Sequence, residues 1–234
     1  MFIQLKSNFQ DYYDHHFTGS WQTPDVVFPR FSNGGLSRPE MFALLSKHNI
    51  ATPTHGFVKE VVPELKEALE TSDFGFFEDY LEVVVYLDEY AHKGEQKIRL
   101  TYNEALAKYP KYFCAEYVPV LSSGTGVSFR HLRIGLRQFW LQYVSLDDWR
   151  SNCGDVQIEV LREEERINDP KDVLILQDRP LVAVDFIPYE DHLLAIDVNT
   201  APGLQKTGIE DYMVAKDVFE EIKDYLEKYW DEDA

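Results

Sequence analysis

Two apolar segments near the C-terminal end of the chain, each interrupted by one acidic residue, constrain the fold more than any other feature. They read V-A-V-D-F-I over residues 182–187 and L-L-A-I-D-V-N over residues 193–199. Segments this apolar and this close together predict two adjacent buried strands. Side chains alternate along a strand, so Asp197 and Asn199 point to the same face, and Asp185 can lie beside them on the neighbouring strand.

These three polar side chains predict a metal site. Two carboxylates and an amide oxygen form a set of hard oxygen ligands, which suits a Mg²⁺ ion that also holds phosphate oxygens. Burying unpaired carboxylates costs free energy, and a bound cation offsets that cost. The alternative is structural: the second strand ends at Asn199 and turns into the A-P-G segment that follows.

The remaining sequence predicts an α+β protein. Helical spacing and capping residues predict helices at residues 37–48, 63–70, 103–108 and 210–230. Apolar and β-branched runs predict strands at residues 2–5, 81–87, 112–118, 129–134, 138–144, 156–161, 181–187 and 193–198. Gly135-Leu136 suits a tight hairpin turn between two of these strands. Strands that follow one another without helices between them predict a mostly antiparallel sheet in the second half.

The composition excludes several classes of partner. The net charge is −18, which disfavours binding to nucleic acid and to anionic lipid. No segment approaches the ~20 apolar residues of a membrane span, and the first residues lack the apolar run of a signal peptide. Cys114 and Cys153 are too few for a disulfide framework. We therefore expect a cytoplasmic protein without nucleic-acid or membrane partners.

The segment D-D-W-R-S-N over residues 147–152 is a second candidate site. Arg150 and Asn152 can orient a phosphate or carboxylate group, Arg150 through its planar guanidinium fork. A solvated turn after a strand is the alternative. A third cluster, D-Y-Y-D-H-H over residues 11–16, has the residue types of a transition-metal site. Such clusters are more often polar turns, and contact with a substrate is a further interpretation of this one.

Several of these segments occur in the order typical of one family. The chain resembles the ATP-grasp superfamily, in particular its RimK-like amide ligases. The segment D-W-R-S-N is similar to that group's D-F-R-S-N, and residues 185–203 resemble its V-D-(strand)-E-V-N-x-S-P-G-L, with Asp197 in place of the usual Glu. C-A-E-Y-V over residues 114–118 resembles the family's Q-E-Y-I hinge, whose backbone meets adenine. The resemblance covers roughly residues 37–223 and is to a divergent, often phage-associated branch.

The resemblance implies an ATP-grasp-like α+β fold of two lobes with a cleft between them. Residues 1–36 would be a short N-terminal substrate-side segment, residues 37–118 the N-terminal lobe, and residues 119–234 the C-terminal lobe with the metal site. The implied cofactors are ATP and Mg²⁺, with Mg²⁺ on Asp185, Asp197 and Asn199. The implied ATP-binding residues are Glu116, Tyr117, Val118, Arg130, Lys93 and Lys97. Arg150 would stabilise the transferring phosphoryl group, and Asn152 would help to hold phosphate or metal.

The implied activity is that of an ATP-dependent carboxylate–amine ligase acting through an acyl phosphate. Its partners would be ATP and a carboxylate-bearing acceptor, either a small molecule or a peptide. The sequence departs from the family pattern at Tyr86, where a lysine usually contacts the ATP phosphates, and it lacks the Gly-rich phosphate loop. Lys93, Lys97 or Arg38 is expected to supply the lost charge. Two alternatives stay open: an ATP-dependent phosphotransferase acting on a hydroxyl, and a degenerate, non-catalytic binding protein.

Overall fold

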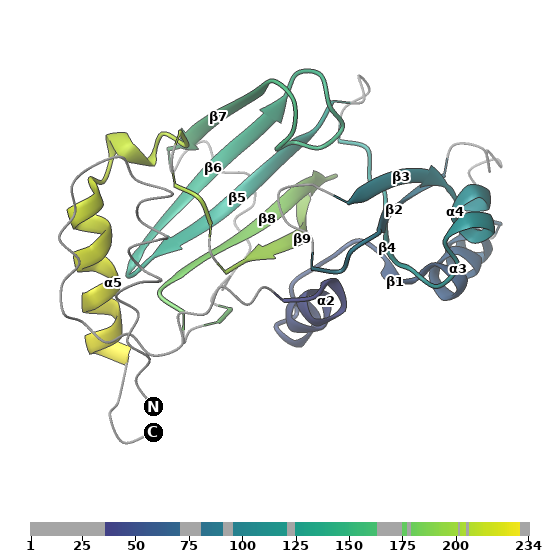
Figure 1. Ribbon diagram of the computed structural model, residues 1–234, viewed down its shortest axis with the longest axis horizontal. Coiled ribbons are helices and arrows are strands. Elements are labelled where there is room, and N and C mark those ends of the chain that lie inside the picture. Colours follow the sequence, from purple (N-terminus) through teal and green to yellow (C-terminus); the bar gives the residue numbers. More distant parts are fainter. Residues whose placement is uncertain are drawn as a thin grey trace.

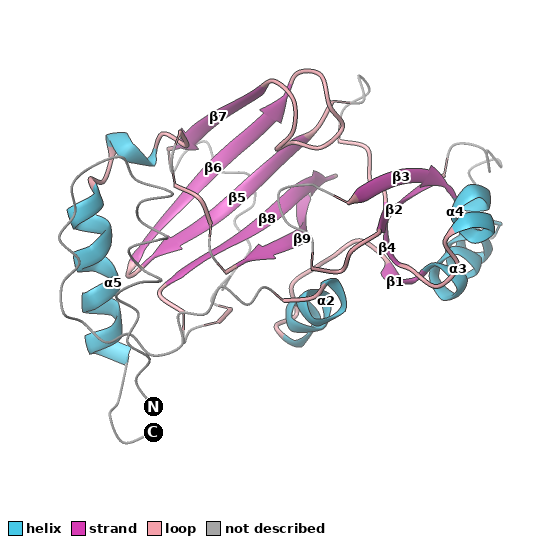
Figure 2. Cartoon of the chain, viewed as in Figure 1, coloured by secondary structure: helices cyan, strands magenta, loops and turns pink. Residues whose placement is uncertain are grey.

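The computed structural model describes residues 36–70, 81–90, 96–120, 125–162, 175–176, 179–200, 202–204 and 206–229. The strand expected at residues 2–5, the cluster at residues 11–16 and Lys93 lie outside these ranges. Within them the chain forms two antiparallel sheets, one of four strands and one of five, with helices packed against both. Figure 1 shows the two sheets side by side, and Figure 2 shows the same view coloured by secondary structure. The predicted α+β class is confirmed.

The four-stranded sheet has the strand order β1–β4–β2–β3. Val83 and Val85 of β2 point to one face, where they pack beneath two helices, α3 and α4. Val84 and Tyr86 point to the other face, towards the second sheet. The bounds are β1 (His55–Phe57), α3 (Val58–Glu70), β2 (Glu82–Tyr86), β3 (Lys97–Thr101), α4 (Tyr102–Lys108) and β4 (Phe113–Glu116).

The five-stranded sheet has the strand order β7–β6–β5–β8–β9, and each neighbouring pair is antiparallel. The predicted hairpin is confirmed: β5 and β6 are joined by Gly135-Leu136, with Gly135 at a φ of 57°. A left-handed backbone of this kind costs glycine no steric penalty. The bounds are β5 (Val127–Ile134), β6 (Arg137–Ser145), β7 (Val156–Leu161), β8 (Leu181–Tyr189) and β9 (His192–Asn199).

Helices cover both faces of the five-stranded sheet. On one face, α5 (Ala215–Tyr229) buries Val218 and Ile222 against side chains of β5, β6 and β8. On the other face, α2 (Arg38–Lys47) buries Met41 and Phe42 in a cluster that also contains Tyr86 and other side chains of the first sheet. This second cluster joins the two sheets. In Figure 1, α2 accordingly lies next to β9, whereas α5 lies at the far end of the molecule from α3 and α4.

Local sequence signals explain where several helices begin. Ser37 caps α2 in a reciprocal capping box with Glu40, and Thr101 caps α4 in the same way with Glu104. The helix expected at residues 63–70 instead begins at Val58, with Pro63 inside it. The helix expected at residues 210–230 is shorter: a 3-10 turn occupies Ile209–Asp211, and α5 follows it. Among the described residues, no helix is long and apolar enough to cross a membrane.

Two strands were not predicted from the sequence. The first, β1, has only three residues. The second, β3, reads K-I-R-L-T, and all five of its side chains are half-buried. Its polar and apolar residues alternate, which is the pattern of a strand. This short signal was overlooked in the sequence, and the pairing with β2 makes it evident. The omission matters because β3 carries Lys97 into the space between the sheets.

Candidate active site

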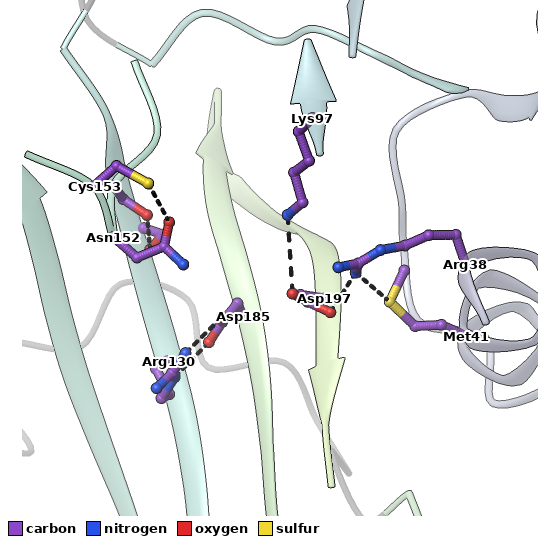
Figure 3. A network of polar contacts seen from close by, with 10 residues as sticks. Arg38, Met41, Lys97, Arg130, Asn152, Cys153, Asp185 and Asp197 are labelled. Atoms are coloured by element: carbon purple, nitrogen blue, oxygen red, sulfur yellow. Dashed lines mark hydrogen bonds and ion pairs between the residues drawn. The ribbon is translucent and has the colours of Figure 1, made fainter. Parts of the chain in front are cut away.

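The two acidic residues that interrupt the apolar strands lie directly opposite each other in the five-stranded sheet. Arg130 of β5 pairs with Asp185 of β8, and Asp185 pairs with Asp197 of β9. Residues paired in this way point to the same face of a sheet. A β-bulge follows directly after Asp185, and such irregularities often occur beside active sites. The predicted placement of the two carboxylates on one face is thus found in the structure (Figure 3).

Arg130 holds Asp185 through a two-pronged ion pair. Its Nε donates to Oδ1 at 2.6 Å, and its Nη2 donates to Oδ2 at 2.8 Å. A third nitrogen, Nη1, donates to the hydroxyl of Tyr143 at 3.1 Å. Burial lowers the pKa of Arg130, but the charge of Asp185 outweighs this and raises the pKa above its ordinary value. The fork therefore gives Asp185 one orientation, because both of its oxygens are engaged.

Two basic side chains from outside the five-stranded sheet contact the carboxylate of Asp197. Arg38 of α2 donates from Nη1 to Oδ1 at 2.5 Å, and Nζ of Lys97 on β3 lies 4.0 Å from Oδ2. Burial alone raises the pKa of this carboxyl group, but Arg38 and Lys97 outweigh burial and lower the pKa of Asp197 to about 2. Asp197 is therefore ionised at neutral pH, although only 20% of its side chain is exposed.

The ring of Tyr86 lies against both of these cations. Its centroid is 5.0 Å from the guanidinium carbon of Arg38 and 5.6 Å from Nζ of Lys97. Tyr86 and Lys97 are paired residues of β2 and β3, so the strand pairing itself brings the ammonium group to this ring. Burial lowers the pKa of Lys97, and the neighbouring Asp197 opposes that shift. The neighbouring strand thus provides a lysine beside the position where the family pattern has one.

A cleft between the two sheets opens beside these residues. It encloses about 820 Å³ of space, including the part open to solvent. Strands β2, β3 and β4 border it on one side, and β5, β8 and β9 border it on the other. The predicted site residues that border it are Lys97, Glu116, Tyr117, Val118, Arg150, Asn152, Asp185 and Asp197. Residues predicted from separate motifs therefore meet around one space.

Two predicted residues are not among those that line the cleft, and a third is not described. Arg130 does not border the cleft and contacts Asp185 from behind it. Asn199 lies two residues beyond Asp197 on the same strand, and it does not border the cleft either. Lys93 lies outside the described residues.

The loop that follows β6 places Arg150 and Asn152 at the cleft. Asp148 accepts two hydrogen bonds from the Arg150 guanidinium, at 2.9 and 2.7 Å, and one from its backbone nitrogen at 2.7 Å. Gly126 packs against the backbone of this loop, where an added Cβ would come within 2.4–2.6 Å of loop atoms. Ser128 and Ser151 share a hydrogen bond of 2.6 Å across the same contact. Any side chain at position 126 would push the loop away from β5.

The acidic pair has the chemistry of a divalent-cation site. Asp185 and Asp197 lie on adjacent strands in direct register, both border the cleft, and both supply hard oxygen ligands. A carboxylate has about four lone-pair positions, so contacts with Arg130 and Arg38 leave acceptor capacity on each. These two residues therefore fit Mg²⁺. Asn199 is not among the residues that line the cleft, and its role stays a prediction.

From the sequence, Tyr86 was interpreted only as the replacement of a lysine. The contact of the Tyr86 ring with two cationic side chains was not predicted. The available signal was alternation: Val84 and Tyr86 are two residues apart, so they share the face of β2 that borders the cleft. Trp149 was likewise missed; it borders the cleft and meets the ring of Tyr117 edge-on, with centroids 5.8 Å apart.

Acid is expected to remove a defined part of the stability through Asp197. Its folded pKa of about 2 lies below the unfolded value of ~3.9, so its stabilising effect is complete above pH ~4 and is lost as the pH falls towards 2. The expected loss is about 2 kcal/mol of unfolding free energy. Urea denaturation from pH 7 to pH 2.5 measures it, with Asp197→Asn lacking this part of the pH dependence. The exposed Asp191→Asn is the control, and parallel curves for wild type and Asp197→Asn would contradict the prediction.

Comparisons with known proteins agree with this architecture. No protein-family model matches the sequence, and no curated protein matches it. Among solved structures, D-alanine–D-alanine ligase from Bacillus anthracis complexed with ATP has a TM-score of 0.51 at 13% identity, over 85% of this chain and 68% of that chain. A second structure of that ligase has a TM-score of 0.50 at 13% identity, over 85% and 69%. The ATP-grasp ligase PsnB, complexed with a minimal precursor, has a TM-score of 0.48 at 10% identity, over 82% and 58%. At these identities the likeness shows the fold alone: the chain folds like the ATP-grasp ligases.

Proposed function

We propose that this protein is an ATP-dependent carboxylate–amine ligase that binds Mg-ATP in the cleft between its sheets. The observation that carries the proposal is the pair Asp185 and Asp197, which lie side by side at the cleft and are contacted by Arg130, Arg38 and Lys97. Two metal-binding carboxylates next to cations from the other sheet and from α2 suit the phosphates of a nucleotide.

In this proposal the base and the phosphates of the nucleotide contact different parts of the cleft. The base lies against the hinge residues Glu116, Tyr117 and Val118, which border the cleft. The phosphates extend towards Lys97 and Arg38, whose donors then turn from Asp197 to phosphate oxygens. Asp185 and Asp197 would hold Mg²⁺, which neutralises phosphate charge and aligns the terminal phosphate when bound. Arg130 serves by keeping Asp185 in a single orientation.

The reaction would have two steps. An oxygen of the acceptor carboxylate attacks the γ-phosphorus of ATP, the bond to the β–γ bridging oxygen breaks, and ADP leaves with the electron pair. The nitrogen of an amine then attacks the acyl carbon and loses a proton, and inorganic phosphate leaves. Arg150 borders the cleft with its orientation set by Asp148. It would stabilise the charge that develops in both steps, with Asn152 as a neighbouring donor.

The first test is nucleotide binding. ATP and ADP with Mg²⁺ are expected to raise the melting temperature, and titration calorimetry is expected to give weaker binding of ATP in EDTA. Acceptor-dependent release of ADP and phosphate, with an amide in the product mass, would then establish ligase chemistry, whereas a phosphorylated product would indicate a phosphotransferase. If no nucleotide shifts the melting temperature in the presence of Mg²⁺, the proposal fails.

Lys97→Met is expected to weaken ADP binding by roughly tenfold to a hundredfold. A hydrogen bond to a charged group contributes about 1.5–3 kcal/mol, and about 1.4 kcal/mol corresponds to a factor of ten in affinity. Titration calorimetry measures the effect. Lys59→Met is the matched control, because it removes the same charge from an exposed position on α3, outside the cleft lining. Equal ADP affinity in the two variants would exclude Lys97 from phosphate binding.

One observation favours a non-catalytic binding protein. The carboxylates of Asp185 and Asp197 are already paired with side-chain cations, and Tyr86 stands at the lysine position of the family pattern. Such a protein would bind nucleotide through the same contacts and release no phosphate with any acceptor. Nucleotide binding is expected for both functions, so only acceptor-dependent release of phosphate distinguishes them.

A further inference from the structure

We propose that Tyr86 is a positioning residue, whose ring holds the cations of Arg38 and Lys97 together at the phosphate end of the cleft. The inference rests on the proposed function for its ligand, the polyphosphate of a nucleoside di- or triphosphate. It assigns Tyr86 a role of its own in a place where the sequence pattern indicates only the loss of a lysine.

The geometry of the cluster supports this role. Tyr86 is 4% exposed, and its ring centroid lies 5.0 Å from the guanidinium carbon of Arg38 and 5.6 Å from Nζ of Lys97. A cation within about 6 Å of an aromatic centroid is attracted by the ring, more strongly where water is excluded. The side chains of Arg38 and Lys97 are only 4% and 14% exposed. Both contacts are therefore in the stronger, poorly solvated class.

The two cations come from elements far apart in the chain, and Tyr86 is a point that both reach. Lys97 is the direct pairing partner of Tyr86 across β2 and β3. Arg38 begins α2, where its Nη1 also lies 3.5 Å from Sδ of Met41. The two like charges repel each other, as the lowering effect of Arg38 on the pKa of Lys97 indicates. Asp197 offsets this repulsion on one side, and the electron-rich ring face offsets it on the other.

The contacts of Arg38 and Lys97 with the ring would matter most with a metal ion bound to Asp197. The carboxylate would then interact less with Arg38 and Lys97, and the flexible side chain of Lys97 could turn away from the site. The ring of Tyr86 does not change partner, so it keeps Lys97 at the cleft and Arg38 next to Lys97, where both can donate to phosphate oxygens. A leucine at this position would fill part of the same apolar space without attracting either cation. The ring, and not the hydroxyl, is the part that matters in this role.

The test compares ADP with adenosine, which lacks the phosphates, in wild type, Tyr86→Phe and Tyr86→Leu. By calorimetry in Mg²⁺, Tyr86→Leu is expected to weaken ADP binding by about tenfold or more while changing adenosine binding by less than about twofold. Tyr86→Phe retains the ring and is expected to restore most of the ADP affinity. Equal losses for ADP and adenosine, or equal losses in the two variants, would overturn the inference.

A ligand-free measurement separates this inference from the proposed function. Melting temperatures of Tyr86→Leu, Lys97→Met and the double variant form a cycle, and the double variant is expected to lose less than the sum of the single losses by about 2 °C or more. Additive losses overturn the role of Tyr86 whether or not ADP binds. Conversely, less-than-additive losses of melting temperature in a protein that binds no ADP would refute the proposed function but would support the contact between Tyr86 and Lys97. If Tyr86→Leu does not fold, Tyr86→Met replaces it in each arm.

Discussion

Asp197→Ala is expected to abolish the effect of Mg²⁺ on ATP binding and to reduce any ligase turnover to background. The variant removes one of the two carboxylates that border the cleft, and Asp185 alone is a poor ligand set for a divalent ion. It also leaves Arg38 and Lys97 with fewer negative partners. Metal-free ADP is therefore expected to bind the variant at least as tightly as it binds wild type. Calorimetry with ATP and ADP, each in Mg²⁺ and in EDTA, measures these opposite changes.

The same substitution is expected to destabilise the ligand-free protein. Arg38 is 4% exposed and bonded to Asp197 at 2.5 Å, and removing one partner of a buried ion pair costs about 3–5 kcal/mol. In a chain of this size that corresponds to a fall of roughly 6–20 °C in melting temperature. Asp191→Ala is the control, since the side chain of Asp191 is 95% exposed. A variant that kept both its stability and its Mg²⁺-dependent ATP binding would refute the assigned role of Asp197.

Arg130→Met is expected to cause a comparable loss of stability, about 3–5 kcal/mol, from the opposite side of the acidic pair. The substitution leaves the buried carboxylate of Asp185 without its two-pronged partner, and an uncompensated buried charge is costly. Arg130→Lys is expected to recover only part of the loss, because an ammonium group cannot reproduce the two-pronged geometry. Urea unfolding at pH 7 gives the free energies.

Two further variants make the Arg130 prediction specific. Arg137→Met breaks an ion pair with Glu221 in which the arginine side chain is 50% exposed, and it is expected to cost no more than about 1 kcal/mol. Arg130→Met combined with Asp185→Leu removes both charges and is expected to be more stable than Arg130→Met alone. If Arg130→Met costs no more than Arg137→Met, the ion pair does not have the structural importance assigned to it.

Local patterns were sufficient for the part of the site that lies on consecutive strands. The apolar runs around Asp185 and Asp197 predicted two paired strands, and the period of two predicted which side chains share a face. Ser37, as an N-cap residue, predicted the start of α2, and Gly135 with Leu136 predicted the hairpin between β5 and β6. In each case the residues that decide the structure are neighbours in sequence, so their pattern contains the answer.

The predicted role of Asn199 depends on more than the alternation along its strand. Alternation puts Asn199 on the same face as Asp197, and that inference concerns the strand alone. Whether a side chain borders the cleft depends on where the other sheet and the loop after β6 come to lie. The cleft reaches Ile196 and Asp197 and does not reach Asn199.

The sequence by itself determined the α+β class, the acidic pair and the two segments that bring Arg150 and Glu116 to the cleft. Only the tertiary structure decided that Arg38, Lys97 and Tyr86 gather at Asp197. Arg38 and Asp197 are 159 positions apart in the chain, and the sequence of β3 does not indicate that this strand pairs with β2 and so brings Lys97 to Tyr86. Contacts of this kind form because four separate elements, α2, β2, β3 and β9, pack together. Their free energy depends on burial and charge in the assembled protein. No local periodicity records such a contact, and so the cation cluster became visible only in the folded chain.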